Sequence, residues 1–356
     1  MKAALLGLME SGKSTIFSAV TAKPLAPVGS AHIQEAVIPV PDSRLDWLTE
    51  YYKPKKVTHA VIDCLDLPGL SFSDQHGRNA AGRIFDKIRT VDLLILVVRA
   101  FQNPDVPHYK NSVDPARDLE ELKTELLLAD LQLVTTRIEN LEKQMQKPRE
   151  HQKRDRHELD LQKKLQETIE AEKPISSAIE TQSEREMVKS LGFLTLKPMI
   201  IAINIGEEQL GEVIDLKDIA HDAADVTAVS AKIEYELSQL DEESRKEFMD
   251  DLGIRESALT KFVHSCYSAL GLISFLTVVS GELRAWPIKK GTTALDAAGK
   301  VHTDIKRGFI RAETFSFDNL KQLGDEKKVK AEGKLRLEGK EYIVNDGDII
   351  NFRFNV

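Results

Sequence analysis

The sequence contains only two cysteines in 356 residues, Cys64 and Cys266, and both lie within apolar stretches. This scarcity argues against a disulfide framework and favours buried thiols in a reducing compartment. Because no stretch of about 18 apolar residues occurs, no transmembrane helix is predicted. The N-terminus also lacks the charged and apolar regions of a signal peptide. We therefore expect a cytoplasmic protein with no membrane partner.

Excess positive charge is also missing, since the formal net charge is -8. A protein with this balance is not a polycation that binds nucleic acid nonspecifically, and no DNA specificity is expected. Any contact with RNA would need a local basic patch. The length, in turn, is too great for one ordinary core and predicts two or three domains.

A phosphate-binding loop is predicted close to the N-terminus, in the stretch LGLMESGKST. Gly7, Gly12, Lys13 and Ser14 fit the pattern G-x-x-x-x-G-K-[ST], between an apolar run and a predicted helix. In that context the backbone N–H groups from Glu10 to Ser14 converge on one point, where the helix dipole favours an anion. Lys13 would reach the β- and γ-phosphates, and the Ser14 hydroxyl would lie on Mg²⁺. The alternative is a chance glycine-rich turn.

Short apolar runs that predict buried parallel strands recur along the chain, at residues 2–8, 58–67, 92–101, 197–205 and 224–231. Helical patterns separate most of these runs. Strands that alternate with helices predict a doubly wound α/β sheet, with ligands bound at the carboxyl ends of the strands.

A glycine-free segment from 118 to 186 interrupts this alternation. Its apolar residues are spaced by three and four, which predicts a coiled coil of two antiparallel helices, and they are Leu131, Val134, Ile138, Leu141, Met145, Leu161, Leu165 and Ile169. The hairpin tip carries a cluster of basic residues, namely Lys147, Arg149, Lys153, Arg154 and Arg156. This cluster could contact RNA phosphates, or it could be an ordinary solvated tip, because acidic residues dilute it and no aromatic side chain is interleaved.

The last segment is rich in short alternating strands punctuated by glycine, with one evident helix at 292–302. This pattern predicts a small β-grasp-like domain. The expected organisation is a nucleotide-binding domain at 1–117 and 190–270, an inserted helical hairpin at 118–189 and the β-grasp domain at 271–356.

A second nucleotide motif, Asp66-Leu67-Pro68-Gly69, follows the apolar run HAVIDCL. Switch-type nucleotide hydrolases place an Asp here to hold Mg²⁺ through water, and a Gly whose N–H senses the γ-phosphate. A simple turn at the end of a strand is the alternative.

Base recognition is predicted at Asn204 and Glu207, which follow the run KPMIIAI. Guanine-specific relatives carry N-K-x-D here, and the Asp accepts hydrogen bonds from guanine N1–H and the exocyclic amine. In this chain Ile205 replaces the Lys and Glu207 is longer than Asp, so guanine recognition should be impaired. The stretch Ser230-Ala231-Lys232 is predicted to cover the base. The alternative for Asn204 is a satisfied turn residue.

Taken together, N-x-x-E in place of N-K-x-D, the coiled-coil insertion and the C-terminal module resemble the YchF family of Obg-like ATPases. The similarity includes LLILVVRAF, ELRAWPIKKGTTALDAAGKVHTDIKRGFIRAE and LRLEGKEYIVNDGDIINFRFNV, and covers nearly the whole chain. It implies a P-loop hydrolase of the Obg-type GTPase superfamily with a C-terminal TGS domain, which prefers ATP to GTP. It also implies association with the ribosome or structured RNA in translation or stress responses, and a monomer is expected rather than an obligate oligomer.

The resemblance assigns roles to individual residues. It places the phosphates on Glu10, Ser11, Gly12, Lys13, Ser14 and Thr15, Mg²⁺ on Ser14 and Asp66, and the base against Asn204, Glu207 and the loop Ser230, Ala231 and Lys232. Leu70 stands where Ras-like enzymes carry the water-orienting Gln, and a leucine cannot position water. The resemblance implies that a loop histidine takes this role, which matches His108, with His76 as a weaker alternative. Lys13 and His108 are the predicted catalytic residues.

Two departures from the family pattern affect these expectations. Family members usually show P-N-V where this chain has Met9-Glu10-Ser11, so an acid lies near the phosphates. The first switch segment is shortened to APVGSAHIQEAV, and Ser30 falls nearest the Thr that would complete the Mg²⁺ shell. The expected protein is a divergent and slow hydrolase. The alternatives are a nucleotide-binding adaptor with little or no hydrolysis and a GTP-specific GTPase.

Overall fold

The structure is a computed structural model that describes residues 1–25, 32–145, 152–254 and 256–355. Its contacts divide the chain into two compact units. The first unit comprises Met1–Ala36 and Cys64–Leu259, and the second comprises Val37–Asp63 and Thr260–Val356. Cys64 and Cys266 are both buried, and neither is part of a disulfide. Among the described residues, no helix is both long and apolar enough to cross a membrane.

The first unit is built on a six-stranded sheet of order β2-β4-β1-β5-β6-β7, although the last three residues of β2 and the first three of β4 fall in the range grouped with the second unit. Its strands are β1 (Lys2–Gly7), β2 (Gln34–Pro39), β4 (Val61–Asp66), β5 (Leu93–Arg99), β6 (Met199–Asn204) and β7 (Asp225–Val229). β5 pairs in parallel with β1 and β6, and β6 pairs in parallel with β7. The five strands predicted from apolar runs are therefore confirmed, and β2 is an additional strand.

Both faces of this sheet are buried at its central strands β1, β5 and β6, as the continuous apolar runs predict. Alternate residues of the strands, such as Ala4, Leu94 and Ile201, belong to a core shared with helices α3 and α4, and their neighbours are buried as well. The helices of this unit are α1 (Lys13–Thr21), α3 (Gln75–Ile88), α4 (Pro115–Met145), α7 (Lys217–Ala220), α8 (Ala231–Gln239) and α9 (Glu242–Asp251). α1 packs against α8, while α3 and α7 pack against α4.

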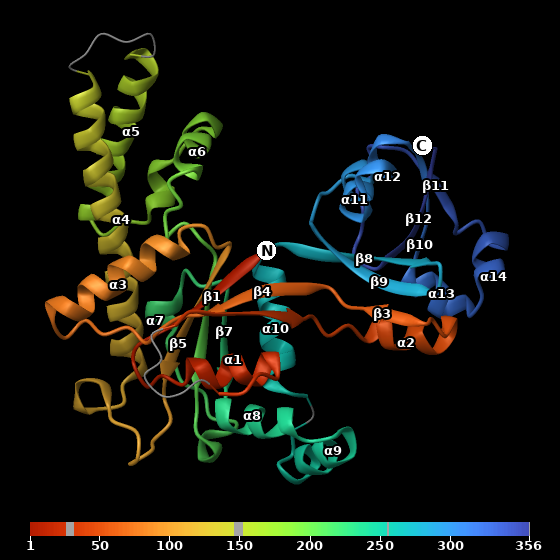
Figure 1. The fold of residues 1–356 in the computed structure, drawn as a ribbon, viewed down its shortest axis with the longest axis horizontal. Helices are drawn as coiled ribbons and strands as arrows, with labels where there is room; N and C mark the ends of the chain where they lie inside the picture. The colour runs from red at the N-terminus through yellow and green to blue at the C-terminus, as the bar shows by residue number, and fades with distance from the viewer. Residues whose placement is uncertain (26–31, 146–151, 255, 356) are drawn as a thin grey trace. The chain divides into compact units, whose positions relative to one another are not determined.

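The predicted helical hairpin consists of α4 and α5 (Gln152–Glu170), which lie side by side in Figure 1. A separate apolar core joins them to η2 (Ile175–Ala178) and to Val188 of α6 (Gln182–Lys189). Arg137 Nε on α4 donates to Glu158 Oε1 on α5 at 2.7 Å. The first turns of α4 instead pack in the core of the sheet, so one continuous helix serves both parts. The hairpin tip with Lys147 and Arg149 lies outside the described residues.

The second unit contains a sheet of order β11-β10-β12-β8-β9-β3. Its strands are β3 (Lys56–Thr58), β8 (Leu272–Val279), β9 (Glu282–Lys289), β10 (Phe309–Ser316), β11 (Arg336–Glu338) and β12 (Asp348–Phe354). β8 pairs with β9 and β10 with β12 in antiparallel fashion, whereas β12 and β8 are parallel neighbours. A central parallel pair formed by the first and last long strands agrees with the β-grasp prediction.

The helices of this unit are α2 (Ser43–Tyr52), α10 (Ala258–Ala269, shared with the first unit), α11 (Ala294–Val301), α12 (Thr303–Arg307), α13 (Phe317–Leu323) and α14 (Glu326–Ala331). The sequence predicted α11 alone within the C-terminal segment. Residues 37–63, which the sequence analysis assigns to the nucleotide-binding domain, group here because β3 pairs in parallel with β9. The two short 3-10 helices of the first unit not yet mentioned are η1 (Tyr109–Asn111) and η3 (Glu207–Gln209).

Candidate nucleotide-binding site

The predicted phosphate loop connects β1 to α1 and has the backbone of an anion site. α1 begins after Gly12, whose φ is 83°, and no side chain caps its first turn. Glu10 also has a positive φ, 60°. Left-handed residues in such a turn direct successive N–H groups into a concavity that suits an anion. Gly7 must lack a side chain, because a Cβ atom there would lie 2.4 Å from Ser11 Oγ and 2.7 Å from the Val97 carbonyl oxygen.

Three predicted phosphate and metal ligands come together behind this loop. Lys13 Nζ lies 3.8 Å from Asp66 Oδ1, and both side chains are almost fully buried. Burial lowers the pKa of Lys13, although Asp66 and Glu10 act to raise it. Burial also raises the pKa of Asp66, although Lys13 and a hydrogen bond from the Ser14 hydroxyl act to lower it. Desolvation therefore outweighs the attraction within this pair.

This arrangement fits a bound Mg²⁺–nucleotide. Asp66 Oδ1 and Ser11 Oγ are buried, and neither has a hydrogen-bond partner within the described part of the chain. A phosphate beside Lys13 and a cation beside Asp66 would each favour the charged form that burial disfavours. No group of three or more His, Cys, Asp or Glu able to hold a metal occurs in the described ranges. Mg²⁺ in phosphate sites takes few protein ligands, so Ser14 and Asp66 suit it.

The second motif lies directly against the phosphate loop. The Leu70 N–H donates to the Gly7 carbonyl at 3.0 Å, and the Met9 N–H donates to the Leu70 carbonyl at 2.9 Å. A Cβ on Gly69 would lie 3.0 Å from Met9 Cα, so a glycine allows this close approach. The Leu70 side chain is buried in the core next to α3 and cannot contact a nucleophilic water. That Leu70 does not orient water stays a prediction.

Asn204 joins the phosphate loop to the predicted base loop. It is buried at the end of β6, where Asn204 Nδ2 donates to the Ser11 carbonyl at 2.9 Å. Its Oδ1 accepts from the Ala231 N–H at 3.0 Å. Gly12 lies so close that a Cβ there would be 2.0 Å from Asn204 Nδ2. Asn204 is thus a clamp between two loops rather than an isolated turn residue.

The other predicted base-binding residues flank this clamp. Ser230 and Ala231 are buried, and Ser230 Oγ has no hydrogen-bond partner among the described residues. Lys232 Nζ forms an ion pair with Glu207 Oε1 at 2.6 Å, and both side chains are about half exposed or more. The Glu207 hydrogen bond raises the pKa of Lys232. Ile205 is buried in the core, so it does not face the site as a lysine of N-K-x-D would.

His108 lies in the loop after β5, directly before η1, and its side chain is exposed. His76 is the second residue of α3 and is also exposed. No hydrogen bond or ion pair of either ring is found in the described part of the chain, so the catalytic role of His108 stays a prediction. Ser30, the predicted third metal ligand, and the surrounding first switch lie outside the described residues. Thr15 is a half-buried residue in the first turn of α1.

Arg99 is an organising residue that the sequence analysis did not identify. It is buried at the end of β5, and its guanidinium donates to the carbonyl groups of Phe101, Asn103, Val106 and Pro107, the last at 2.8 Å. The guanidinium also lies over the Phe101 ring, 4.4 Å from its centroid. One side chain therefore fixes the segment that leads to His108. The only sequence signal is a charge at the end of an otherwise apolar run.

Comparison with known proteins agrees with this site. Residues 2–180 match the family model described as 50S ribosome-binding GTPase. Residues 272–355 match the model YchF-GTPase_C, described as a protein of unknown function.

Full-length relatives are similar as well. The chain is 37% identical to the ribosome-binding ATPase YchF of Bacillus subtilis, with 100% of both chains covered. It is 35% identical to Obg-like ATPase 1 of Oryza sativa, covering 100% of this chain and 92% of the relative. The solved structure of the Schizosaccharomyces pombe YchF GTPase superposes with a TM-score of 0.84 at 31% identity, covering 99% of this chain and 97% of that one. The chain therefore belongs to the YchF family and is a P-loop nucleotide hydrolase.

Proposed function

We propose that the chain is a Mg²⁺-dependent molecular switch that hydrolyses ATP in preference to GTP and changes its binding to the ribosome with its nucleotide state. The observation that carries the ATP preference is the ion pair between Glu207 and Lys232. Guanine recognition needs a carboxylate that is free to accept two N–H groups from the base. Here the Glu207 carboxylate is paired with Lys232, and the Ile205 side chain is buried in the core. Both features disfavour guanine.

The buried Lys13, Ser14 and Asp66 support Mg²⁺ dependence. In this arrangement Lys13 binds the β- and γ-phosphates, and Ser14 and Asp66 hold the metal directly or through water. Bound Mg²⁺ would neutralise charge that develops on the phosphates. Glu10 places a carboxylate on the same loop, and its attraction to Lys13 competes with that of the phosphates. This competition supports slow turnover.

His108 is the proposed water-positioning residue, because Leu70 is buried in the core. Arg99 holds the backbone up to Pro107 by hydrogen bonds, so the residue directly before His108 has a fixed position. The exposed ring can then move toward the phosphates when nucleotide binds. Catalytic contacts of this kind often form only in the bound complex.

The ribosome is the proposed partner because relatives at 35–37% identity are named ribosome-binding ATPases. Structured RNA is the proposed contact there, and the cytoplasm is the corresponding compartment. A monomer is the proposed state of the chain.

The test is parallel calorimetric titration of ATP and GTP in the presence of Mg²⁺. Wild type should bind ATP more tightly, and the double variant Ile205→Lys/Glu207→Asp, which restores N-K-x-D, should shift the preference toward GTP. Glu212→Asp is the matched control, because it shortens an exposed acid a few residues further along the chain. Tighter binding of GTP than ATP by wild type would overturn the ATP preference.

Single-turnover hydrolysis tests the catalytic assignment. We expect His108→Ala to bind nucleotide normally and to lose hydrolysis, and His76→Ala to retain both. The alternative function, a nucleotide-gated adaptor, is favoured by the buried Leu70 and by Glu10 beside Lys13. It gains support if wild type hydrolyses ATP no faster than Lys13→Ala does.

A further inference from the structure

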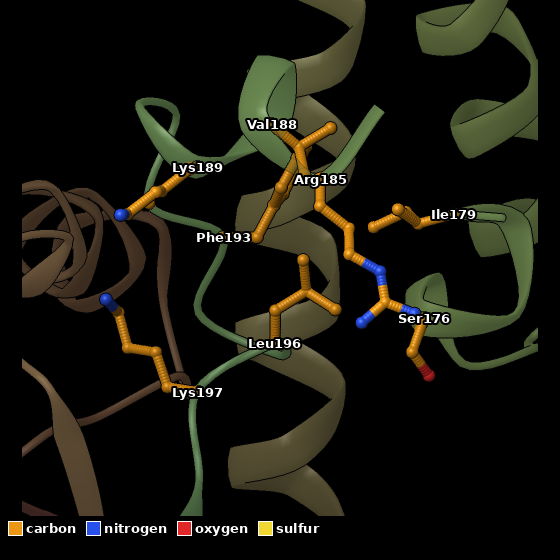
Figure 2. Close-up of a pocket in the computed structure, with 9 residues that line it drawn as sticks. Ser176, Ile179, Arg185, Val188, Lys189, Phe193, Leu196 and Lys197 are labelled. Carbon is orange, nitrogen blue, oxygen red and sulfur yellow. The ribbon is translucent and has the colours of Figure 1, made fainter. Parts of the chain in front are cut away.

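A cavity of about 450 Å³ lies in the first unit, between α6 and the turn that follows it (Figure 2). Its apolar wall consists of Ile179, Val188, Phe193 and Leu196, and the first three of these are buried. Three cations line it as well, namely Arg185, Lys189 and Lys197. None of the nine lining residues is acidic. The cavity thus combines an apolar wall with positive charge.

The walls of this cavity are fixed from both sides. α6 begins with a capping box, in which the Glu184 N–H donates to Thr181 Oγ1 and the Glu184 carboxylate accepts from the Thr181 N–H. On the other side, the buried Asp130 carboxylate accepts from the N–H groups of Leu194 and Thr195 at 3.0 and 2.9 Å. Gly192 lies in the turn between α6 and Leu194. A glycine is required there, because φ is 62° and a Cβ would lie 2.5 Å from the Arg89 carbonyl oxygen. The cavity is therefore preorganised.

The three cations differ in their contacts and exposure. Lys197 Nζ donates to the carbonyl groups of Arg89 and Val91 at 2.8 and 2.6 Å, so it is part of the wall. Arg185 and Lys189 are exposed and one helical turn apart on α6. Within the described residues neither side chain has a hydrogen bond or an ion pair. Figure 2 shows their charged groups on opposite sides of the apolar wall, with Lys189 on the side of Lys197, so each can receive a separate carboxylate of one ligand.

We propose that this cavity binds an acidic peptide segment of a partner protein, with a large apolar side chain against Val188, Phe193 and Leu196 and carboxylates on Arg185 and Lys189. Figure 2 shows the Arg185 guanidinium between Ile179, Leu196 and Ser176, where it can receive a carboxylate at the edge of the apolar wall. Because both cations are exposed, the cavity would cover only part of its ligand. A segment of a larger chain suits this better than an enclosed small molecule, most of whose surface a site normally buries.

The shape of the cavity favours peptide over RNA. The wall is mainly aliphatic, and Phe193 is only 2% exposed, so no aromatic face is available for base stacking. The protein as a whole carries a net charge of -8, so an acidic peptide gains no general attraction. Binding would therefore depend on the local pair Arg185 and Lys189 and would weaken as salt concentration rises.

The experiment is selection of a phage-displayed random dodecapeptide library on the immobilised full-length chain, followed by fluorescence anisotropy with the selected peptide. We expect enrichment of peptides with a large apolar residue flanked by Asp or Glu. The charge reversal Arg185→Glu/Lys189→Glu should weaken binding at least about tenfold, which is the loss of one charge-assisted hydrogen bond. Leu196→Ser should weaken it as well. Lys143→Glu/Lys173→Glu is the matched control with the same change in net charge, and should bind like wild type.

Three results would overturn the proposal. The first is a selection that yields no such motif. The second is a selected peptide that binds the cavity variants and the control equally well. The third is a labelled oligouridylate that binds wild type, loses affinity in Arg185→Glu/Lys189→Glu and competes with the peptide, since this would identify a nucleic-acid site. None of these readouts depends on nucleotide binding or hydrolysis, so the proposed function is tested separately.

Discussion

Replacing Asn204 should disrupt stability and nucleotide binding together, because its side chain joins two loops of the site. Asn204→Ala removes the donor to the Ser11 carbonyl and the acceptor for the Ala231 N–H. Both backbone groups would then be buried without a partner, at about 1–3 kcal/mol each. We therefore expect a loss of about 2–6 kcal/mol in the free energy of unfolding if the two costs add and water does not replace the side chain.

The variant Asn204→Asp separates the two contacts. Its carboxylate can still accept from the Ala231 N–H but turns an oxygen toward the Ser11 carbonyl, so the phosphate loop loses its tether. Affinity for Mg²⁺–ATP, measured by calorimetry, should fall at least about tenfold, equivalent to 1.4 kcal/mol. Asn79→Asp, an exposed change of the same chemistry on α3, is the control. Wild-type affinity in Asn204→Asp would refute the clamp.

Three further predictions concern other parts of the first unit. Asp130→Ala should lower the free energy of unfolding by about 3–5 kcal/mol in denaturant titrations, because it leaves the Arg89 guanidinium without its buried partner at 2.9 Å. Arg99→Lys should speed amide hydrogen exchange in residues 101–107 while leaving the rest of the unit protected, since an ammonium cannot reach four carbonyl groups at once; unchanged exchange would contradict the role of Arg99. Acidification should begin to weaken Mg²⁺–ATP binding at a pH above 3.8. The reason is that the raised pKa of Asp66 causes its carboxylate to be protonated at a higher pH than an ordinary one. In titrations from pH 7 downward, Asp66→Asn should lack this component.

The sequence predicted the parts of the fold whose signal is local. β1, β5 and β6 are continuous apolar runs, and their length is typical of a strand buried on both faces and too short for a helix. β2 buries only two of its six residues and β3 has three residues, so neither carries a comparable pattern. The grouping of 37–63 with the C-terminal unit depends on pairing between β3 and β9, more than 200 residues apart, which no local pattern specifies.

In the candidate site too, the sequence predicted which residues take part but not which of them contact each other. The motifs predicted Lys13, Asp66 and Asn204 by position, because each follows an apolar run at a fixed spacing. That Asn204 holds Ser11 could not be predicted, since 193 residues separate them. Arg99 was missed for a related reason: its partners are carbonyl groups, which every residue carries, so the sequence contains no pattern for them.

Glu10 shows how a departure from a family motif changes electrostatics more than backbone geometry. Its φ of 60° is a value that non-glycine residues adopt at some cost, and α1 still begins after a left-handed Gly12. The Glu10 carboxylate, however, raises the pKa of both Lys13 and Arg99, against the lowering effect of burial. Glu10 thus acts on the residue that binds the phosphates and on the residue that holds the His108 loop. A phosphate that approaches Lys13 must overcome the repulsion of this acid, so the loop keeps its shape while its attraction for nucleotide is weakened.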